Sequence, residues 1–498
     1  MATPASNATS QGSDDQHLVI FDQVRAILRF HNLPALALRL RNQDVAPADT
    51  ASSIHGCQIL SEPLFGAHHI LFTIEFNDGV RWLLKVPANG YLGAFDAMSA
   101  RALRSEVMTM RLIKKETTVP VPEVYHFDHT LHNELGCPFI LMEYVDGRSL
   151  YDVWFDQTAG PEVLERRRCR ALEGVAQAVM QLNKFVFSRA GEILFDESGN
   201  PCDVGPQRMV DMSAMLDCLR ENDDYDGSYI FCTVGPFSDA KSWFICMLDR
   251  REPPKHEFGA GVLEALRLFI DLVFPDSGHL PETEDDAQFV LSHPDLDIQN
   301  VIVSDDGSLL SLIDWDGVGT VPRCLGNEAY PTWLTRDWDK AKYAFDENAA
   351  PGPDCPNYRE NSPSELEHYR EVYQKIIEKI SEFPSTAKKV TSQSLLLQNL
   401  YIAVVDPVCT TCIVERVFEE IKARTATTES STGSDSEHHG TGVVGEGSSD
   451  CDVGRIDASG QEEADDFSLH TVCTGLQRGD LSDQHLQRLK SGFQALLL

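Results

Sequence analysis

Residues 293–316 read HPDLDIQNVIVSDDGSLLSLIDWD, and this stretch decides the fold class. It contains the spacing H-x-D-x4-N, and a further aspartate follows the asparagine by fourteen residues. The β-prone runs 300–304 and 309–313 flank the turn sequence Asp-Asp-Gly at 305–307, so we expect a hairpin between the two polar motifs. Such a hairpin brings three side chains to loop ends that face one point, with oxygens suited to hold Mg²⁺ and to orient an attacking hydroxyl: Asp295, Asn300 and Asp314.

The chain upstream of this stretch is predicted to begin with a small β-rich unit. The runs 64–76 and 81–86 are joined by Asn-Asp-Gly at 77–79, a strong hairpin signal, and 138–142 is a short apolar strand. Asp96 can cap a helix that runs to about Lys115 and turns one apolar face inward.

The rest of the chain is predicted to be mainly helical. Residues 150–290 are typical of helices and loops, and Ser362-Pro-Ser-Glu365 is a capping box that begins another helix. Together with the β-rich front, this pattern predicts an α+β, two-lobed fold with a ligand cleft between the lobes.

The predicted domain boundaries follow shifts in composition. Residues 425–466 contain 19 Ser, Thr or Gly, eleven acids and one base, so we expect a disordered acidic linker there. The organisation that we expect has five parts: a disordered start (1–16), an N-terminal helical element with a nucleotide-binding lobe (17–147), a helical lobe with the catalytic loop and acceptor site (148–424), the linker (425–466) and a C-terminal helix (467–498).

Charge and cysteine content limit the classes of partner and compartment. The 42 Lys and Arg residues against 77 Asp and Glu residues give a net charge of −35, which disfavours binding to nucleic acids and to anionic membranes. No apolar stretch reaches the length of a membrane helix, and residues 1–16 do not read as a signal or transit peptide. The thirteen cysteines show no disulfide framework, so we expect a cytoplasmic protein with reduced thiols.

The two motifs in 293–316 resemble the HGDxxxxN and IDW[DE] motifs of the aminoglycoside phosphotransferase and choline kinase-like family, within the protein-kinase-like superfamily. Residues 314–322 and 331–339 look like fungal members of that family, and the resemblance covers roughly residues 55–400. It implies a two-lobed kinase-like enzyme that uses ATP and Mg²⁺. By this resemblance, Asp295 is the catalytic base, and Asn300 and Asp314 hold the metal.

The same resemblance implies a nucleotide clamp in the front lobe. Lys85 stands at the position of the strand lysine that grips the α- and β-phosphates, and Glu106 is its expected partner. Gly66 lies where a phosphate-covering loop belongs. The segment 142–147 would be the hinge that offers backbone groups to adenine, through Glu143, Tyr144 and Val145.

Three further positions have specific expected roles. His293 is expected to support the Asp314 loop through hydrogen bonds rather than to transfer protons. Asp316 is read either as a turn former that supports the site or as a direct metal ligand. Asp297 stands where protein kinases place a lysine, so an acid there requires an offsetting cation or a cationic substrate. Together with the long insert after Gly147, Asp297 argues against a protein kinase.

The sequence therefore predicts a small-molecule kinase that transfers the ATP γ-phosphoryl group to a hydroxyl of a metabolite it does not identify. The alternative is a pseudokinase, in which the same fold serves as a nucleotide-binding scaffold or regulatory module. The acidic run 221–226 is read either as a solvated loop or as a collector of a cationic acceptor. The apolar stripe on 486–496 is expected either to pack on the body or to dock a protein partner.

Overall fold

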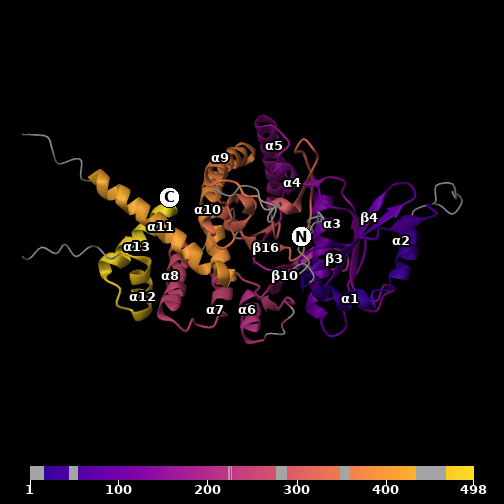
Figure 1. The fold of residues 1–498 in the computed structure, drawn as a ribbon, viewed down its shortest axis with the longest axis horizontal. Coiled ribbons are helices and arrows are strands. Elements are labelled where there is room, and N and C mark those ends of the chain that lie inside the picture. Colours follow the sequence, from indigo (N-terminus) through magenta and orange to yellow (C-terminus); the bar gives the residue numbers. More distant parts are fainter. Residues whose placement is uncertain are drawn as a thin grey trace, which may run out of the picture.

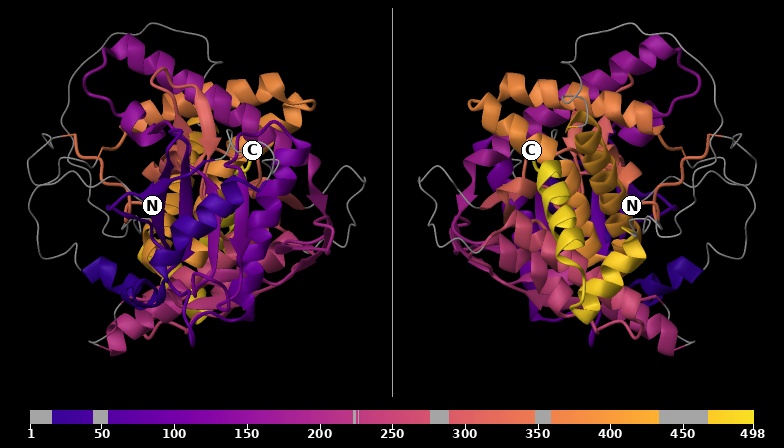
Figure 2. Two further views of the ribbon diagram at one scale, coloured as in Figure 1. Left: turned by 90° about the vertical axis from the view of Figure 1, so that its right-hand side faces the viewer. Right: turned by 90° about the vertical axis from the view of Figure 1, so that its left-hand side faces the viewer.

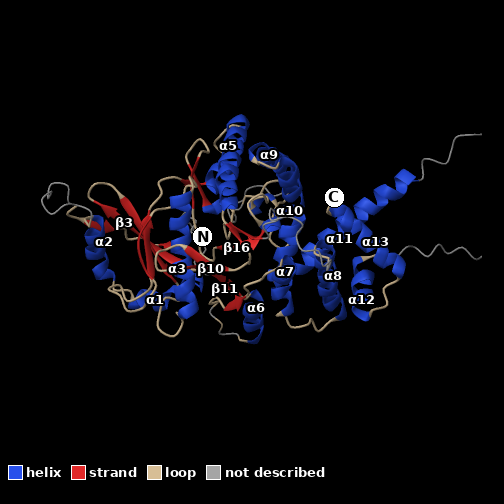
Figure 3. Cartoon of the chain, turned by 180° about the vertical axis from the view of Figure 1, so that it is seen from behind, coloured by secondary structure: helices blue, strands red, loops and turns tan. Residues whose placement is uncertain are grey.

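The computed structural model describes residues 16–43, 54–222, 225, 227–275, 289–347, 359–432 and 467–498. The molecule is elongated, with a sheet-rich unit at one end of the long axis and a group of helices at the other (Figure 1). Figure 3 shows the same division from behind, with the long strands gathered at one end. The α+β, two-lobed architecture expected from the sequence is confirmed.

One antiparallel sheet forms the front lobe. Its strands follow the order β1-β3-β4-β6-β5, and the short β2 pairs with β3. The strand bounds are β1 (Cys57–Ile59), β2 (Leu64–Phe65), β3 (His69–Phe76), β4 (Arg81–Pro87), β5 (Val124–Asp128) and β6 (Phe139–Glu143). The β3–β4 hairpin confirms the predicted Asn-Asp-Gly turn, where Gly79 adopts φ +83°.

Helices cover both faces of this sheet. Helices α1 (Asp22–Ile27) and α2 (Leu33–Arg41) share one apolar cluster with strand residues such as Leu141, whereas α3 (Ala97–Glu116) clusters with Ile140. Because neighbouring strand residues point to opposite faces, α2 and α3 lie on opposite sides of the sheet. The Asp96 carboxylate accepts a hydrogen bond from the Ser99 N–H at 2.7 Å, which confirms the predicted cap.

The region between the front sheet and residue 289 contains more strands than we predicted. The expectation of mainly helices and loops over 150–290 was wrong for five short strands: β8 (Val186–Phe187), β9 (Glu192–Phe195), β10 (Pro201–Gly205), β11 (Gln207–Val210) and β12 (Phe231–Val234). Strands of two to five residues are too short to display a period-two pattern, which is why the sequence did not reveal them. The helices here match the prediction: α4 (Leu150–Trp154), α5 (Pro161–Val179), α6 (Met212–Glu221), α7 (Ala240–Asp249) and α8 (Glu257–Val273).

The polar motifs lie on two neighbouring three-stranded sheets. Strand β13 (Phe289–Ser292) pairs with β16 (Gly319–Pro322) and β8, and the loop that contains Asp295 and Asn300 follows it. Strands β14 (Val301–Val303) and β15 (Leu309–Leu312) form the predicted hairpin, which β7 (Arg148–Ser149) extends. The turn residue Gly307 adopts φ +87°, as a tight turn requires. The polar motifs of the sequence thus lie in two loops, one before β14 and one after β15, at the same end of the hairpin.

Five helices follow β16, and the last three of them lie at the end of the molecule far from the front sheet (Figure 1). Their bounds are α9 (Pro363–Ile380), α10 (Pro384–Val405), α11 (Pro407–Thr432), α12 (Leu469–Arg478) and α13 (Asp483–Leu496). The right-hand view of Figure 2 shows α12 and α13 at this end, in yellow. Phe493 of α13 is fully buried and stacks on Phe269 of α8, with ring centroids 4.6 Å apart. This part of the apolar stripe on 486–496 thus packs on the body of the protein.

Two of the predicted C-terminal boundaries need correction. The single C-terminal helix expected over 467–498 is two helices, because the chain turns at Gly479, which adopts φ +72° after α12. Helix α11 continues to Thr432, so the linker boundary at 425 is too early. Extending a formed helix adds one hydrogen bond per residue, so polar residues can continue it. Residues 1–15 and 433–466, where we predicted disorder, lie outside the described residues.

The capping box of α9 provides a stability test away from the site. The Ser362 Oγ accepts a hydrogen bond from the Glu365 N–H, and the Glu365 carboxylate accepts one from the Ser362 N–H. We expect Ser362→Ala to destabilise the protein by about 1 kcal/mol because one helix N–H loses its acceptor. Urea unfolding measures the change, and Ser362→Thr, which keeps the hydroxyl, should retain most of the stability. Equal midpoints for Ser362→Ala and the parent would contradict the cap.

Candidate active site

A buried lysine joins the sheet to α3 and to the loop after β15. Lys85 of β4 donates a hydrogen bond to Glu106 Oε1 at 2.7 Å and another to Asp314 Oδ1 at 3.1 Å. The side chains of Lys85 and Glu106 are only 4% and 3% exposed, whereas that of Asp314 is 38% exposed. Lys85 therefore lies in the protein interior, while the Asp314 carboxylate remains accessible at the cleft.

Lys85 and Asp314 stabilise each other's charge, whereas burial raises the pKa of Glu106 to about 7 despite the neighbouring Lys85. Burial by itself lowers the pKa of Lys85, but the carboxylates of Glu106 and Asp314 raise it above its ordinary value. Burial also opposes ionisation of Asp314, yet the ammonium group of Lys85 holds the pKa of that carboxyl well below its usual range. Lys85 is thus a fixed cation and Asp314 a fixed anion at neutral pH.

The loop between β13 and β14 places Asp295 and Asn300 against each other. The Asn300 Nδ2 donates hydrogen bonds to the backbone oxygen of Asp295 at 2.8 Å and to its Oδ2 at 3.0 Å. The Asp295 side chain faces solvent at the cleft, but partial desolvation and the nearby carboxylates of Asp297 and Asp314 raise its pKa to about 6. A carboxylate whose pKa is raised toward neutrality is better suited to accept a proton from a hydroxyl.

His293 links the two passes of the chain through the site. Its Nδ1 accepts a hydrogen bond from the Asp295 N–H at 3.2 Å, and its Nε2 lies 3.0 Å from the Ile313 carbonyl oxygen. Burial lowers the pKa of His293 to about 4, so the ring is neutral and can donate from Nε2. The ring also packs edge-on against Trp315 at 4.5 Å. These contacts match the supporting position that we expected for this histidine.

Asp314 has an unusual backbone conformation. Its φ is +63°, and it is the one non-glycine residue in the described part of the chain with a positive φ. Such a conformation costs about 1–3 kcal/mol and persists when the surroundings impose it. The next residue, Trp315, is fully buried, and its indole N–H donates to the Leu312 carbonyl at 3.0 Å. Trp315 thereby anchors the turn that directs the Asp314 carboxylate toward Lys85.

The acid at Asp297 has a partner within the chain. Arg336 Nη2 donates a hydrogen bond to Asp297 Oδ2 at 2.6 Å, and Arg336 Nη1 donates to the buried Glu360 at 3.1 Å. Sequence reasoning required a cation or a cationic substrate beside Asp297, and Arg336 supplies that cation. Asp297 therefore gives no separate reason to expect a cationic acceptor. The acidic run 221–226, the other reason for one, lies only partly within the described residues.

The predicted loop and hinge lie at the ends of strands of the front sheet. The Gly66 N–H donates to the His69 carbonyl at 2.8 Å and closes the turn between β2 and β3. Glu143 ends β6, and the Tyr144 N–H donates to the Arg81 carbonyl at 3.3 Å. Val145 follows in the connection to β7. The contact of these three hinge residues with adenine stays a prediction.

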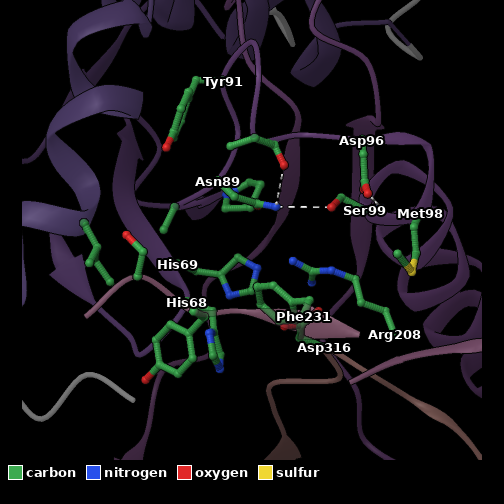
Figure 4. Close-up of a pocket in the computed structure, with 16 residues that line it drawn as sticks. His68, His69, Asn89, Tyr91, Asp96, Met98, Ser99, Arg208, Phe231 and Asp316 are labelled. Atoms are coloured by element: carbon green, nitrogen blue, oxygen red, sulfur yellow. Dashed lines mark hydrogen bonds between the residues drawn. The ribbon is translucent and has the colours of Figure 1, made fainter. Parts of the chain in front are cut away.

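The geometry also reveals a pocket that the sequence did not indicate. A cavity of about 280 Å³ opens beside Asp316, and residues that lie far apart in the sequence line it, including His68, His69, Asn89 and Arg208 (Figure 4). The pocket borders the Lys85 cluster, because His69 interacts electrostatically with Lys85 and Asp314. Sequence reasoning missed Arg208 because it lies on β11, one of the strands that the sequence did not reveal.

The residues present fit a magnesium ion. Asn300 Oδ1 is buried and has no hydrogen-bond partner, because the Nδ2 of the same amide is turned toward Asp295. Within the described residues no group of three or more His, Cys, Asp or Glu side chains forms a metal cluster. Magnesium needs few protein ligands when phosphate oxygens and water complete its shell. Asn300 and Asp314 are the side chains suited to hold it.

Comparison with known proteins identifies the family to which this chain belongs. The sequence model of the phosphotransferase enzyme family matches residues 71–324, which is just over half of the chain. A relative in Lachancea thermotolerans, altered inheritance of mitochondria protein 9, is 24% identical over 69% of this chain and 59% of its own length. The protein of the same name in Vanderwaltozyma polyspora is 24% identical over 62% of this chain and 52% of its own length. The chain thus spans little more than half the length of these curated relatives.

Solved structures of small-molecule kinases resemble the chain more distantly. A thermostable mutant of the aminoglycoside phosphotransferase APH(4)-Ia is 13% identical, with 78% of this chain and 98% of the other covered and a TM-score of 0.36. The amicoumacin kinase hAmiN, in complex with AMP-PNP, Ca²⁺ and Ami, is 11% identical, with 76% and 86% covered and a TM-score of 0.40.

The expected cytoplasmic location is contradicted by these relatives. The Lachancea and Vanderwaltozyma proteins are both named as mitochondrial. The cytoplasmic prediction rested on the composition of residues 1–16 and on the expectation of reduced cysteines. Reduced thiols do not separate the cytosol from the mitochondrial interior. Among the described helices, none combines the length and apolarity that a membrane span requires.

Proposed function

Because the chain belongs to the phosphotransferase enzyme family, we propose that it transfers the γ-phosphoryl group of ATP to a hydroxyl group of a small molecule. The observation that carries this proposal is the contact of Lys85 with both Glu106 and Asp314, at 2.7 and 3.1 Å. A phosphate-gripping lysine held by a helix glutamate and directed at a metal-binding aspartate is the arrangement that kinase-type phosphoryl transfer requires.

Each polar group then has a distinct task. Lys85 offsets the charge of the nucleotide phosphates, and Glu106 keeps its ammonium group in place. Asp295 orients the acceptor hydroxyl and takes its proton as the new bond to phosphorus forms. When bound, Mg²⁺ would neutralise charge on the phosphate oxygens, and Asn300 and Asp314 would hold it.

The pairing of a buried lysine with a buried glutamate also favours activity over a purely structural fold. Removing an isolated ion pair from water is costly, and apolar side chains of similar volume commonly replace such a pair without loss of stability. The chain keeps Lys85 and Glu106 buried and adds a third charge, Asp314, at the cleft. A nucleotide-binding scaffold remains the alternative, and turnover separates the two.

Nucleotide binding is the first measurement. A thermal-shift titration with ATP should raise the melting temperature in the presence of Mg²⁺ and do so much less when EDTA removes the metal. At a ligand concentration of 100 Kd, the expected stabilisation is about 2.7 kcal/mol. Absence of any nucleotide-dependent shift, with or without Mg²⁺, would contradict the proposal.

We also propose that this chain shares the mitochondrial location in the names of its relatives. Fractionation of the source cells, followed by protease protection of the isolated organelles, tests it. Recovery in the cytosolic fraction alone would contradict this proposal and would leave the proposed chemistry untouched.

A further inference from the structure

The pocket beside Asp316 contains a cation without a bonded partner. Arg208 of β11 stacks on Phe231 of β12, with its guanidinium carbon 3.2 Å from the ring centroid. Within the described part of the chain, Arg208 makes no hydrogen bond or ion pair. Figure 4 shows its guanidinium group pointing into the pocket, toward the ring of His69. An arginine in a partly buried site without an acceptor loses hydrogen bonds to water that a ligand can restore.

A second unpartnered donor or acceptor faces the same region. His68 Nδ1 is buried and has no hydrogen-bond partner, while the His68 ring packs against Tyr229 with centroids 3.9 Å apart. Burial lowers the pKa of His68, so the ring is neutral and can present either N–H or lone pair. Arg208 and His68 come from β11 and from the β2–β3 turn, so the pocket forms only when the insert folds against the sheet.

Carboxylates in the wall restrict which ligand fits. Asp96 also lines the pocket, but its carboxylate is occupied in capping α3 at Ser99. Asp316 makes no hydrogen bond or ion pair with another described side chain and faces the cavity. A dianionic phosphate in this cavity would meet the negative charge of Asp316. A carboxylate on Arg208, accompanied by a hydroxyl or ammonium donor toward Asp316, satisfies both groups.

We propose that this pocket binds the carboxylate end of the acceptor, and that the acceptor is a small hydroxylated carboxylate. This inference rests on the proposed phosphoryl transfer. Arg208 binds the acceptor carboxylate, His68 adds a hydrogen bond, and Asp316 accepts a donor group of the same molecule. Because Asp316 follows Asp314 by two residues, a molecule held here lies beside the phosphate-binding cluster. The pocket therefore requires a carboxylate on the acceptor, which the cationic acceptor suggested by the acidic run 221–226 would not need.

The test measures binding of matched small probes to the full chain saturated with AMP-PNP and Mg²⁺. DL-glycerate and L-serine carry the carboxylate, and glycerol and serinol lack it. Isothermal titration calorimetry should detect binding of glycerate or serine. The dissociation constants of glycerol and serinol should be at least tenfold higher. Arg208→Met, which keeps an apolar stem on Phe231, should weaken carboxylate binding by about ten- to a hundredfold. Arg220→Met, which removes an exposed arginine of α6, is the matched control and should change nothing.

Each other outcome overturns the inference in a recognisable way. Equal affinities for glycerate and glycerol would rule out a carboxylate site. Failure of both carboxylates to bind the parent protein would also rule it out. If Arg208→Met instead weakened AMP-PNP as strongly as glycerate, the pocket would serve the nucleotide phosphates, and inorganic phosphate would compete with AMP-PNP. An unchanged affinity of Arg208→Met for AMP-PNP also shows that the variant is folded. Failure of the proposed function would appear separately, as absent magnesium-dependent nucleotide binding.

Discussion

Replacing Asp295 with asparagine is expected to lower the turnover number by about 10²–10⁴-fold, which corresponds to about 3–5 kcal/mol on the activation barrier. The amide keeps the shape of the side chain but cannot accept the hydroxyl proton as a carboxylate does. Its oxygen can still accept the hydrogen bond from Asn300 Nδ2 that now goes to Asp295 Oδ2 at 3.0 Å. The loop geometry should therefore survive the substitution.

Nucleotide affinity separates the chemical effect from damage to the loop. Asp295 contacts neither Lys85 nor Glu106, so the Kd for ATP and Mg²⁺ should stay within a few-fold of the parent value. Nucleotide affinity should rise slightly, because the substitution removes one negative charge near the phosphates. Asp305→Asn, at an exposed turn of the β14–β15 hairpin, is the matched control. Undiminished turnover in Asp295→Asn would show that this residue has no role in the mechanism. Equal losses of turnover and nucleotide binding would show that the substitution had damaged the loop.

Asp314→Asn is expected to abolish the magnesium-dependent part of nucleotide binding. The substitution removes a carboxylate that offsets the metal charge, while asparagine tolerates the φ of +63° found at this position. At 100 Kd of the parent, the variant should lose the stabilisation of about 2.7 kcal/mol that ATP with Mg²⁺ confers. Lys85 keeps its bond to Glu106 at 2.7 Å, so the folded lobe should persist.

The readout is the difference between melting temperatures with and without EDTA at fixed ATP. Asp305→Asn again serves as the control and should keep the parent difference. Asp314→Asn should show the same small shift in both conditions. A magnesium-dependent shift equal to that of the parent would mean that other groups hold the metal.

The structure brings together the five polar residues that the sequence singled out, and local patterns encode the positions of several of them. Asp295 and Asn300 lie in one loop five residues apart, and the Asp-Asp-Gly turn brings Asp314 back beside them. Lys85 and Glu106 lie on a strand and a helix that each carry their own signals, the Asn-Asp-Gly turn and the Asp96 cap. Local turn and capping chemistry therefore predicted these elements, and the family resemblance supplied the expectation that Lys85 and Glu106 meet.

Contacts between distant and weakly patterned segments could not be predicted. Arg208 lies on a four-residue strand, and its pocket also requires the turn before β3 and the residue after Trp315. The ion pair of Asp297 with Arg336 spans 39 residues and leaves no periodic trace. The positive φ of Asp314 depends on the packing of Trp315, which tertiary structure alone determines. Charge partners across the fold thus had to come from the structure.

The most direct test of the account is transfer of labelled γ-phosphoryl from ATP to an acceptor. The parent protein, incubated with Mg²⁺ and pools of hydroxylated metabolites, should form one phosphorylated acceptor for each ADP released. Asp295→Asn should bind ATP under the same conditions and form product at least a hundredfold more slowly. Magnesium-dependent ATP binding without transfer to any acceptor, in both proteins, would contradict the enzyme and support a nucleotide-binding scaffold.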